Sequence, residues 1–470
     1  MKTSEIENIF ELFNIEIRNN SRANEDIDKY YWDEYLKYLE LEYNLINENL
    51  KNREIEDILH DPFIEDLELI DLYNHLFKLC NTIFEKSGNY YWIYILKMVN
   101  ILLNNGNIKI NSIYSTYSIF LASRGDYNSA FKFSLLDLNI NKKIKNYSEI
   151  SNSSVILANY NIPWNLHLKF SEDFNREGMR YSLKSEEKTS GVYSSFHYIV
   201  NSYYLGKNLT YLKQEKSNIF NFVNIVKNDL ALSTISSFEF LINKLIGEIN
   251  RDTICSEYYP SDLDIIEDKS HTLYTYGINI YNIMKAQVLY ILGNYKEGYE
   301  ILTEVENSIS ILGSLNSIAE YYFIDSLLLT KLICNSDLET RAEYFDKLKE
   351  NQLKMKTWSL NCPENFYHKY LLVEAEIAGI EYKHWKASSL YDLAILEAKK
   401  NEFIQNEGIA YECASIFYFQ KRNLELGEKY LLEAYRCYKE WGALAKCELM
   451  KSNFSELLVE EEFQDNQIHY

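Results

Sequence analysis

The sequence predicts an all-α protein in which antiparallel helix pairs stack side by side into a solenoid. The 470 residues include only 15 Gly and 4 Pro, which is little turn chemistry for a sheet protein. Small and apolar residues recur at helical spacing along most of the chain. A helix–turn–helix pattern recurs at several places, and one such pair is too small to bury both of its faces. Repetition of the pair therefore favours a superhelix.

The clearest helix pair lies in residues 281–307. Gly293 is expected to end the first helix, because a chain leaving a helix often needs a left-handed residue. Tyr295 is expected to wedge between the two helices. The inner faces are predicted to carry small or apolar residues at spacings of three and four, namely Ala286, Leu289, Gly298, Leu302 and Val305. This pattern is typical of a tetratricopeptide-like hairpin.

Three further hairpins match this register. The first covers residues 111–139, with Gly125 and Tyr127 at its turn. The other two lie near the C-terminus and begin 40 residues apart, more than the roughly 34 residues of a strict tetratricopeptide. Residues 193–226 and 315–349 are helical by period but match less well. Connections are predicted at Pro163 with Trp164, at Pro260 and at Pro363, since the residue before a proline avoids helical geometry.

The sequence divides into three parts. Residues 1–53 are predicted to form a helical cap or arm, with helices over 5–18 and 26–49; a cap on the solenoid and a partner-binding arm both stay open. Residues 54–458 form the solenoid, and residues 459–470 an acidic, frayed tail. The acidic stretch 54–71 is interpreted as a solvated face, because it lacks the spacing of a calcium loop. The polar segment 253–270 is expected to be a long loop.

Composition excludes several partners and compartments. The formal net charge of −21 argues against nucleic acid and anionic membranes, which demand clustered Lys and Arg. The compact basic run Lys142, Lys143 and Lys145 is interpreted as a solvated loop. No signal peptide and no stretch of 18 apolar residues is seen, so a cytoplasmic protein is expected. The seven scattered cysteines, without a CxxC pair, indicate reduced thiols.

No catalytic or cofactor motif occurs in the sequence. A phosphate-binding GxxxxGK[ST] loop, HExxH, GxSxG and the kinase catalytic loop are absent. The eight histidines show no ligand spacing with one another or with cysteine. We therefore expect no enzyme activity, no cofactor and no metal.

Two stretches carry the candidate binding residues. His197 is flanked by aromatic residues, and His368 follows Asn365 by three positions. One interpretation is that both histidines are packed structural residues. The alternative is that they line a concave groove that receives a protein or peptide segment. The candidate groove residues are Phe196, His197, Tyr203, Tyr204, Asn365, His368 and Lys369. Trp441 with Gly442 is expected to lock the final hairpin.

Four stretches support a wider resemblance: residues 94–107, 194–207, 361–376 and 430–450, of which YLLEAYRCYKEWGALAKCELM is the longest. The chain resembles the tetratricopeptide-like helical region of multidomain bacterial proteins that combine a serine/threonine kinase, a STAND ATPase, a GAF domain and a sensor histidine kinase. This resemblance implies an α-solenoid that acts as sensor or relay between catalytic modules. The motifs of those modules do not occur in this sequence.

The predicted function is a non-catalytic protein-interaction scaffold or signalling relay whose concave groove binds a protein or peptide segment. An acidic surface favours a partner with a basic surface. The alternative is a sensor solenoid that binds a small molecule or signalling peptide and switches conformation. A direct DNA-binding repressor is not expected, because residues 1–50 are acidic.

Overall fold

The computed structural model describes residues 25–86, 91–110, 113–186, 188–226, 229–248, 272–334, 336–455 and 457–458. These residues form helices joined by short turns, with no β-strand among them beyond a single bridge between Phe63 and Asn107. The prediction of an all-α protein is confirmed for this part of the chain. Two compact units are present, one up to Ile113 and one from Tyr114 onward.

Unit 1 contains α2 (Glu25–Leu50), the 3₁₀ turn η1 (Ile55–His60), α3 (Leu67–Lys86) and α4 (Tyr91–Asn105). α2 confirms the helix predicted over residues 26–49, whereas residues 5–18 lie outside the described part. Asn100 on α4 ties the helices together by donating to the backbone oxygen and the carboxylate of Glu42, both at 3.0 Å. From the sequence we placed a boundary between the N-terminal part and the solenoid after residue 53. In the structure η1, α3 and α4 belong to the same compact unit as α2.

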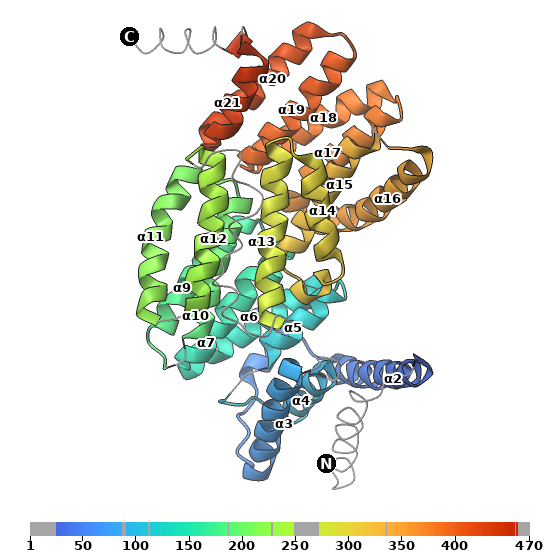
Figure 1. Cartoon of the computed structure of the whole chain (residues 1–470). Helices are drawn as coiled ribbons and strands as arrows, with labels where there is room; N and C mark the ends of the chain where they lie inside the picture. The colour runs from blue at the N-terminus through green and yellow to red at the C-terminus, as the bar shows by residue number, and fades with distance from the viewer. Residues whose placement is uncertain are drawn as a thin grey trace. The chain divides into compact units, whose positions relative to one another are not determined.

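Unit 2 holds the remaining helices, whose consecutive members pack as antiparallel pairs (Figure 1). In chain order they are α5 (Tyr114–Ser123), α6 (Tyr127–Ile144), α7 (Tyr147–Ile156), the π-helix η2 (Leu157–Asn161), α8 (Ile162–Asn165), η3 (Leu168–Phe170), α9 (Ser171–Ser182), α10 (Thr189–Tyr204), α11 (Leu209–Val226), α12 (Asp229–Ile246), α13 (Thr272–Ile291), α14 (Tyr295–Glu306), η6 (Ile309–Leu312), α15 (Asn316–Ile333), α16 (Leu338–Asn361), α17 (Pro363–Ile380), α18 (His384–Lys400), α19 (Ile404–Gln420), α20 (Leu424–Trp441) and α21 (Leu444–Asn453).

The two clearest predicted hairpins correspond to α5–α6 and α13–α14. Their turn glycines adopt the left-handed conformation that glycine favours, with φ of 86° at Gly125 and 87° at Gly293. The predicted inner-face residues of the second hairpin are buried: Ala286, Leu289, Gly298, Leu302 and Val305. Helix period and turn chemistry therefore predicted these pairs correctly.

The last helices of unit 2 are the most regular. Left-handed residues occur at positions 382, 402, 422 and 442, so successive turns lie 20 residues apart. Two helices and two turns thus make the 40-residue spacing seen in the sequence. Tyr382, Glu402 and Arg422 occupy this position instead of glycine, at φ of 62°, 61° and 58°.

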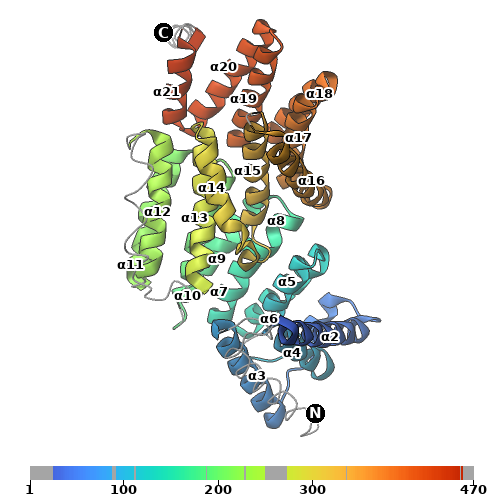
Figure 2. The same cartoon turned by 45° about the vertical axis from the view of Figure 1, so that its right-hand side comes forward.

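Antiparallel helices place alternate turns at opposite ends of the array. The turns at Tyr382 and Arg422 lie at one end, which we call the outer edge. The turns at Cys362, Glu402 and Gly442 lie at the other end, which we call the inner edge. Figure 2 shows α18, α19 and α20 next to one another along these edges.

Pro163 does not end its helix where expected. α7, η2 and α8 run on as one helix through Pro163, whose missing N–H and bulky ring are accommodated by the wider π turn before it. The chain leaves helical geometry only at Leu166, with φ −139° and ψ 160°. The predicted connection is therefore displaced by three residues. Pro363 begins α17, as predicted, and Pro260 lies outside the described residues.

The basic run also differs from the prediction. Lys142 and Lys143 belong to the last turn of α6, and Lys145 caps that helix in the left-handed conformation. All three are solvent-exposed, as expected, but they end a helix and do not form a loop. This location suits cations, because the C-terminal end of a helix carries partial negative charge.

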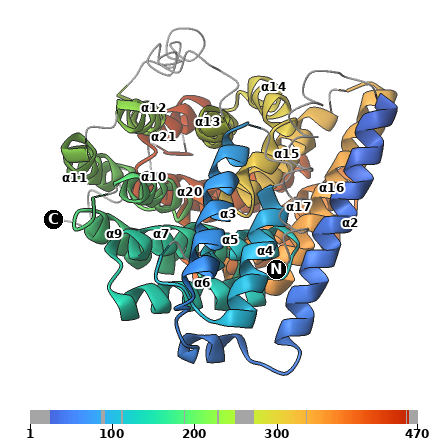
Figure 3. The same cartoon turned by 90° about the horizontal axis from the view of Figure 1, so that it is seen from below.

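The last helix of unit 2 returns to the α11–α12 pair. α21 lies beside α12, as seen from below in Figure 3. Asn208, just before α11, donates to the backbone oxygen of Glu440 at 2.8 Å. Segments more than 200 residues apart in sequence thus contact each other, and the inner edge of the array is covered by the chain itself.

Candidate functional site

The candidate residues lead to one long-range contact within unit 2. On one side are residues 163–170 and the turn 204–208; on the other is the inner edge of α16–α20. We call this contact the seam. Three of the seven predicted groove residues make contacts across the seam, namely Tyr203, Tyr204 and Asn365. His368 and Lys369 lie one helical turn beyond Asn365 on α17.

Asn365 holds the backbone of the opposite segment. Its Nδ2 donates to the backbone oxygens of Pro163 and Leu166 at 2.7 and 2.8 Å. Its Oδ1 accepts from the backbone N–H of Leu168 at 2.9 Å. The side chain is 1% exposed. One buried amide therefore satisfies three backbone groups that the end of α8 leaves without helical partners.

Trp164 is the apolar anchor of the same segment. Its ring is 2% exposed and lies 5.2 to 5.3 Å, between centroids, from Tyr127, Trp358 and Phe366. The indole Nε1 donates to the backbone oxygen of Ser314 at 2.5 Å. A buried tryptophan with its N–H satisfied combines large apolar area with fixed orientation. Trp164 therefore fixes residues 163–170 in place.

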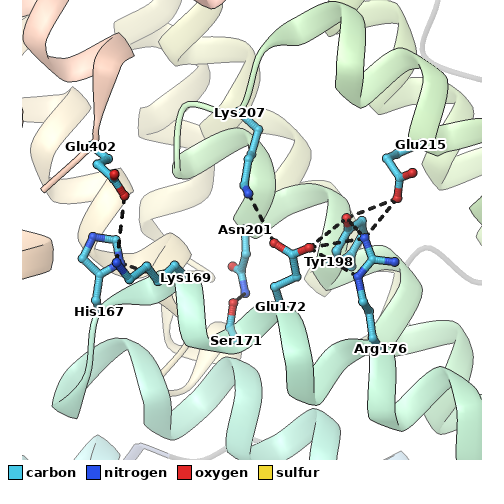
Figure 4. Close-up of polar contacts among 10 residues, drawn as sticks. All are labelled: His167, Lys169, Ser171, Glu172, Arg176, Tyr198, Asn201, Lys207, Glu215 and Glu402. Carbon is cyan, nitrogen blue, oxygen red and sulfur yellow. Dashed lines mark hydrogen bonds and ion pairs between the residues drawn. The ribbon is translucent and has the colours of Figure 1, made fainter.

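His167 connects the segment to the turn between α18 and α19. Its Nε2 lies 2.9 Å from the backbone oxygen of Asn401 and therefore carries the proton. Its Nδ1 accepts from the backbone N–H of Lys169 at 3.1 Å, and the Lys169 ammonium lies 3.9 Å from Glu402 (Figure 4). Burial lowers the pKa of His167, which favours the neutral ring.

His368 lies behind this turn and is 2% exposed. Its ring stacks on Phe403 at 4.7 Å, and its Nε2 lies 2.9 Å from Nδ2 of Asn406. Burial, with a smaller contribution from the neighbouring Lys369 charge, holds the pKa of His368 well below its usual value. The imidazole is therefore neutral at physiological pH.

Lys369 forms a fully buried ion pair with Glu320 of α15, and both side chains are 1% exposed. The rings of Phe323, Phe366 and Phe403 surround its ammonium at 5.6 to 5.9 Å. Buried charges persist only when paired, so each partner depends on the other.

Tyr203 and Tyr204 contribute to the seam through α10. The ring of Tyr203 lies 5.8 Å from Trp441, and the backbone oxygen of Tyr204 accepts from Nε2 of Gln405 at 2.5 Å. Gly206 allows its segment to approach α19 closely, because a Cβ at this position would lie 2.0 Å from Oε1 of Gln405. Burial raises the pKa of both phenols, so both are protonated.

Phe196 and His197 lie on another face of α10, toward α12 and α13. Phe196 packs on Phe238, with 5.2 Å between ring centroids. His197 is 2% exposed, and its Nε2 lies 2.6 Å from the hydroxyl of Tyr276. Burial lowers the pKa of His197 to about 3. The structure therefore separates these two residues from the other five.

All seven predicted groove residues are 7% exposed or less, so none presents its side chain to solvent in this structure. The positions of His197 and His368 agree with the interpretation of packed structural histidines. A direct contact of these residues with a partner stays a prediction. Sequence reasoning missed their main contacts, Trp358, Phe403, Gln405, Asn406 and Glu320, which only the folded chain brings close.

A second polar cluster lies on α9, α10 and α11 (Figure 4). Arg176 Nη2 donates to the Tyr198 hydroxyl at 2.5 Å and lies 3.3 Å from carboxylate oxygens of both Glu172 and Glu215. Lys207 pairs with Glu172 at 3.3 Å. Every charge drawn in this cluster has a partner, so the cluster joins α9, α10 and α11.

Two buried thiols of unit 2 also have shifted pKa values. Burial raises the pKa values of the Cys362 and Cys413 thiols to about 12, so both are protonated and poor nucleophiles. The six described cysteines are free thiols. In the described ranges no three His, Cys, Asp or Glu side chains are arranged to hold a metal ion. None of the helices in these ranges combines the length and the apolar character that a membrane span requires.

Comparison with known proteins gives one informative similarity. No protein-family model matches the chain. The chain is 24% identical over 210 residues to hybrid signal transduction histidine kinase G of Dictyostelium discoideum, a match that covers 37% of this chain and 6% of that protein. The chain thus spans a small fraction of the relative's length. The similarity is partial and distant, and it is to a signalling protein.

Proposed function

We propose that this chain is a non-catalytic, tetratricopeptide-like scaffold or relay in signal transduction, whose inner face binds a protein or peptide segment. The observation that carries the proposal is the set of three backbone hydrogen bonds made by Asn365. In the free chain these bonds hold residues 163–168, so a partner segment takes them by displacing that segment, and such backbone bonds do not depend on the partner's sequence.

The packing of the helix pairs supports the same function. Stacked hairpins give an extended inner face whose residues come from many repeats, which suits recognition of a chain segment. The seam offers amides for a backbone, with Asn361 donating to the Trp164 oxygen beside Asn365. Its aromatic site, which Trp164 fills in the free chain, would receive one large side chain of a partner that displaces residues 163–170. Partial similarity to a signalling histidine kinase supports a place in signal transduction.

Co-purification from cell extract at moderate salt tests this function. We expect a partner that is retained by the wild-type protein and lost with Asn365→Ala. Gln420→Ala, at an exposed position that ends α19, is the matched control and should keep the partner. If the folded, monodisperse wild-type protein retains no partner, or if both variants retain it equally, the proposed inner-face function is wrong.

A sensor that binds a small molecule or signalling peptide is the second candidate function. It is favoured by buried polar atoms near the seam that have no hydrogen-bond partner among the described residues: His368 Nδ1, Gln405 Oε1 and Asn406 Oδ1. Native proteins leave few such groups unsatisfied, because each costs about 1–3 kcal/mol. A ligand that satisfies them must raise the melting temperature, so thermal shift with fractionated extract tests this alternative. If no fraction raises the melting temperature, the sensor function is contradicted.

A further inference from the structure

The outer edge carries three of the most exposed large side chains in the described part of the chain. Tyr382 is 75% exposed, Trp385 is 92% exposed and Leu424 is 62% exposed. One exposed apolar residue is ordinary on a protein surface. A tryptophan and a tyrosine on one turn are less ordinary, since these residue types dominate the energetics of protein interfaces.

The two outer turns form one continuous surface. The ammonium of Lys421 lies 5.6 Å from the centroid of the Tyr382 ring, which joins the α19–α20 turn to the α17–α18 turn. His384 packs on Phe417 of α19, with 6.1 Å between ring centroids. Aromatic rings from one turn and cations from the next are therefore presented side by side.

The two outer turns place residues other than glycine in the left-handed conformation, as the inner turn at Glu402 also does. Gly125 and Gly293 hold the corresponding left-handed position in α5–α6 and α13–α14, where an added Cβ would meet nothing within 4 Å. Glycine is thus favoured there by φ alone. Tyr382 and Arg422 adopt the same conformation with side chains that disfavour it. The turn itself therefore requires neither side chain, and the same holds for Glu402 at the inner edge.

The charge of the outer edge is opposite to that of the whole chain. Lys383 pairs with Glu381 at 2.8 Å and Lys386 with Glu374 at 3.2 Å. Lys421 and Arg422 form no ion pair with any described residue, and Glu425 is the nearest acidic residue along the chain. Two available cations stand out on a protein with 69 acidic and 48 basic residues.

We propose that the outer edge is a docking surface for an acidic segment of a partner protein that carries an apolar anchor. Tyr382 and Trp385 receive the anchor, while Lys421 and Arg422 pair with the carboxylates. Charge complementarity selects this partner, because basic segments are repelled here and attracted elsewhere on the acidic surface. The surface lies at the opposite ends of the helices from the seam, so the inference does not depend on the function proposed for the seam.

Selection from a random 12-residue phage-displayed library on the whole chain tests the proposal. We expect enriched peptides that combine Asp or Glu with an aromatic or aliphatic residue. Their affinity should fall at least tenfold for Tyr382→Gly and for Arg422→Gly, while the melting temperature of each variant stays equal or rises. Leu360→Ser is the matched control: Leu360 on α16 is 77% exposed but away from the outer edge, and affinity should be unchanged.

Three results of this experiment would contradict the proposal. If no acidic peptide is enriched on the folded protein, the surface does not have the proposed specificity. If affinity survives both glycine substitutions, the peptides bind elsewhere. If Tyr382→Gly lowers the melting temperature clearly, the side chain serves the fold after all. Binding of a single-stranded oligonucleotide through Lys421 and Arg422, without acidic peptides, would assign the edge to another class of ligand.

Discussion

The turns at the inner and outer edges of the last helix pairs have the same backbone conformation, but the inner turn is buried and the outer turn is exposed. At the inner edge, Phe403 N–H donates to the Ala398 oxygen at 3.0 Å after the left-handed residue Glu402. At the outer edge, Asn423 N–H donates to the Tyr418 oxygen at 3.0 Å after Arg422. Phe403 is fully buried against His167 and His368, whereas Asn423 is exposed. Local sequence therefore determines the turn, and distant segments determine whether it is available to a partner.

Trp164 at the seam and Trp385 at the outer edge should respond most differently to removal. Trp164→Ala leaves a cavity among three aromatic rings at the seam and an unsatisfied Ser314 oxygen, so it should cost about 3–5 kcal/mol of unfolding free energy. Trp385→Ala removes a side chain that is 92% exposed and should change stability by less than about 0.5 kcal/mol. Urea denaturation followed by circular dichroism measures both. Equal losses would remove the distinction between the edges.

The lysines of the two edges give the second contrast. Lys369→Met leaves Glu320 charged and buried, which should destabilise the protein by about 3–5 kcal/mol. Lys369→Met combined with Glu320→Leu removes both charges and should recover most of that loss. Lys421→Met at the outer edge should be close to neutral. The same denaturation series checks all three, and a double variant as unstable as Lys369→Met would contradict the buried pair.

Buried histidine makes the interior sensitive to acid. His197 has a folded-state pKa of about 3 against roughly 6.5 when unfolded. Between these values the unfolded state binds more protons, so the stabilisation is complete above pH 6.5 and declines as pH falls, by about 1.4 kcal/mol per pH unit. Lowering the pH from 6.5 to 5 should therefore cost about 2 kcal/mol through this residue. Denaturation of His197→Gln at both pH values should show a correspondingly smaller difference than wild type; an equal difference would contradict this assignment.

Substituting glycine at the outer edge should change the stability least among these variants, and the change should be stabilising. Tyr382→Gly and Arg422→Gly relieve left-handed strain and should stabilise the protein by about 0.5–1 kcal/mol. Gly293→Ala introduces the same strain at the equivalent turn and should cost about 1 kcal/mol. Melting temperatures of the three variants check the signs. A loss of stability in the first two would mean that the side chains are needed for packing.

Local features of the fold could be predicted from the sequence. The period of Ala286, Leu289, Gly298 and Leu302 and the turn at Gly293 depend on neighbouring residues, so one sequence contains the signal. The connection was predicted at Pro163, three residues too early, because a π turn that accommodates a proline has no distinct sequence pattern.

The seam could not be predicted. Asn365 donates to the backbone oxygen of Leu166, which lies 199 positions away in the sequence. No local sequence pattern around either residue predicts this contact. Sequence reasoning selected Asn365, His368 and Lys369 as candidate groove residues; it could not tell that the chain itself covers them. The strain at Tyr382 and Arg422 was equally hidden, since only glycine marks a left-handed position in a sequence.

Hydrogen exchange of the native protein tests the contrast between the edges most directly. Peptides covering residues 163–170 and 401–407 at the seam should exchange slowly, because their amides open only when the seam separates. Peptides covering residues 381–385 and 421–424 at the outer edge should exchange quickly, despite the same turn geometry. Equally fast exchange at both edges would show that the inner face is open in solution and would contradict the account.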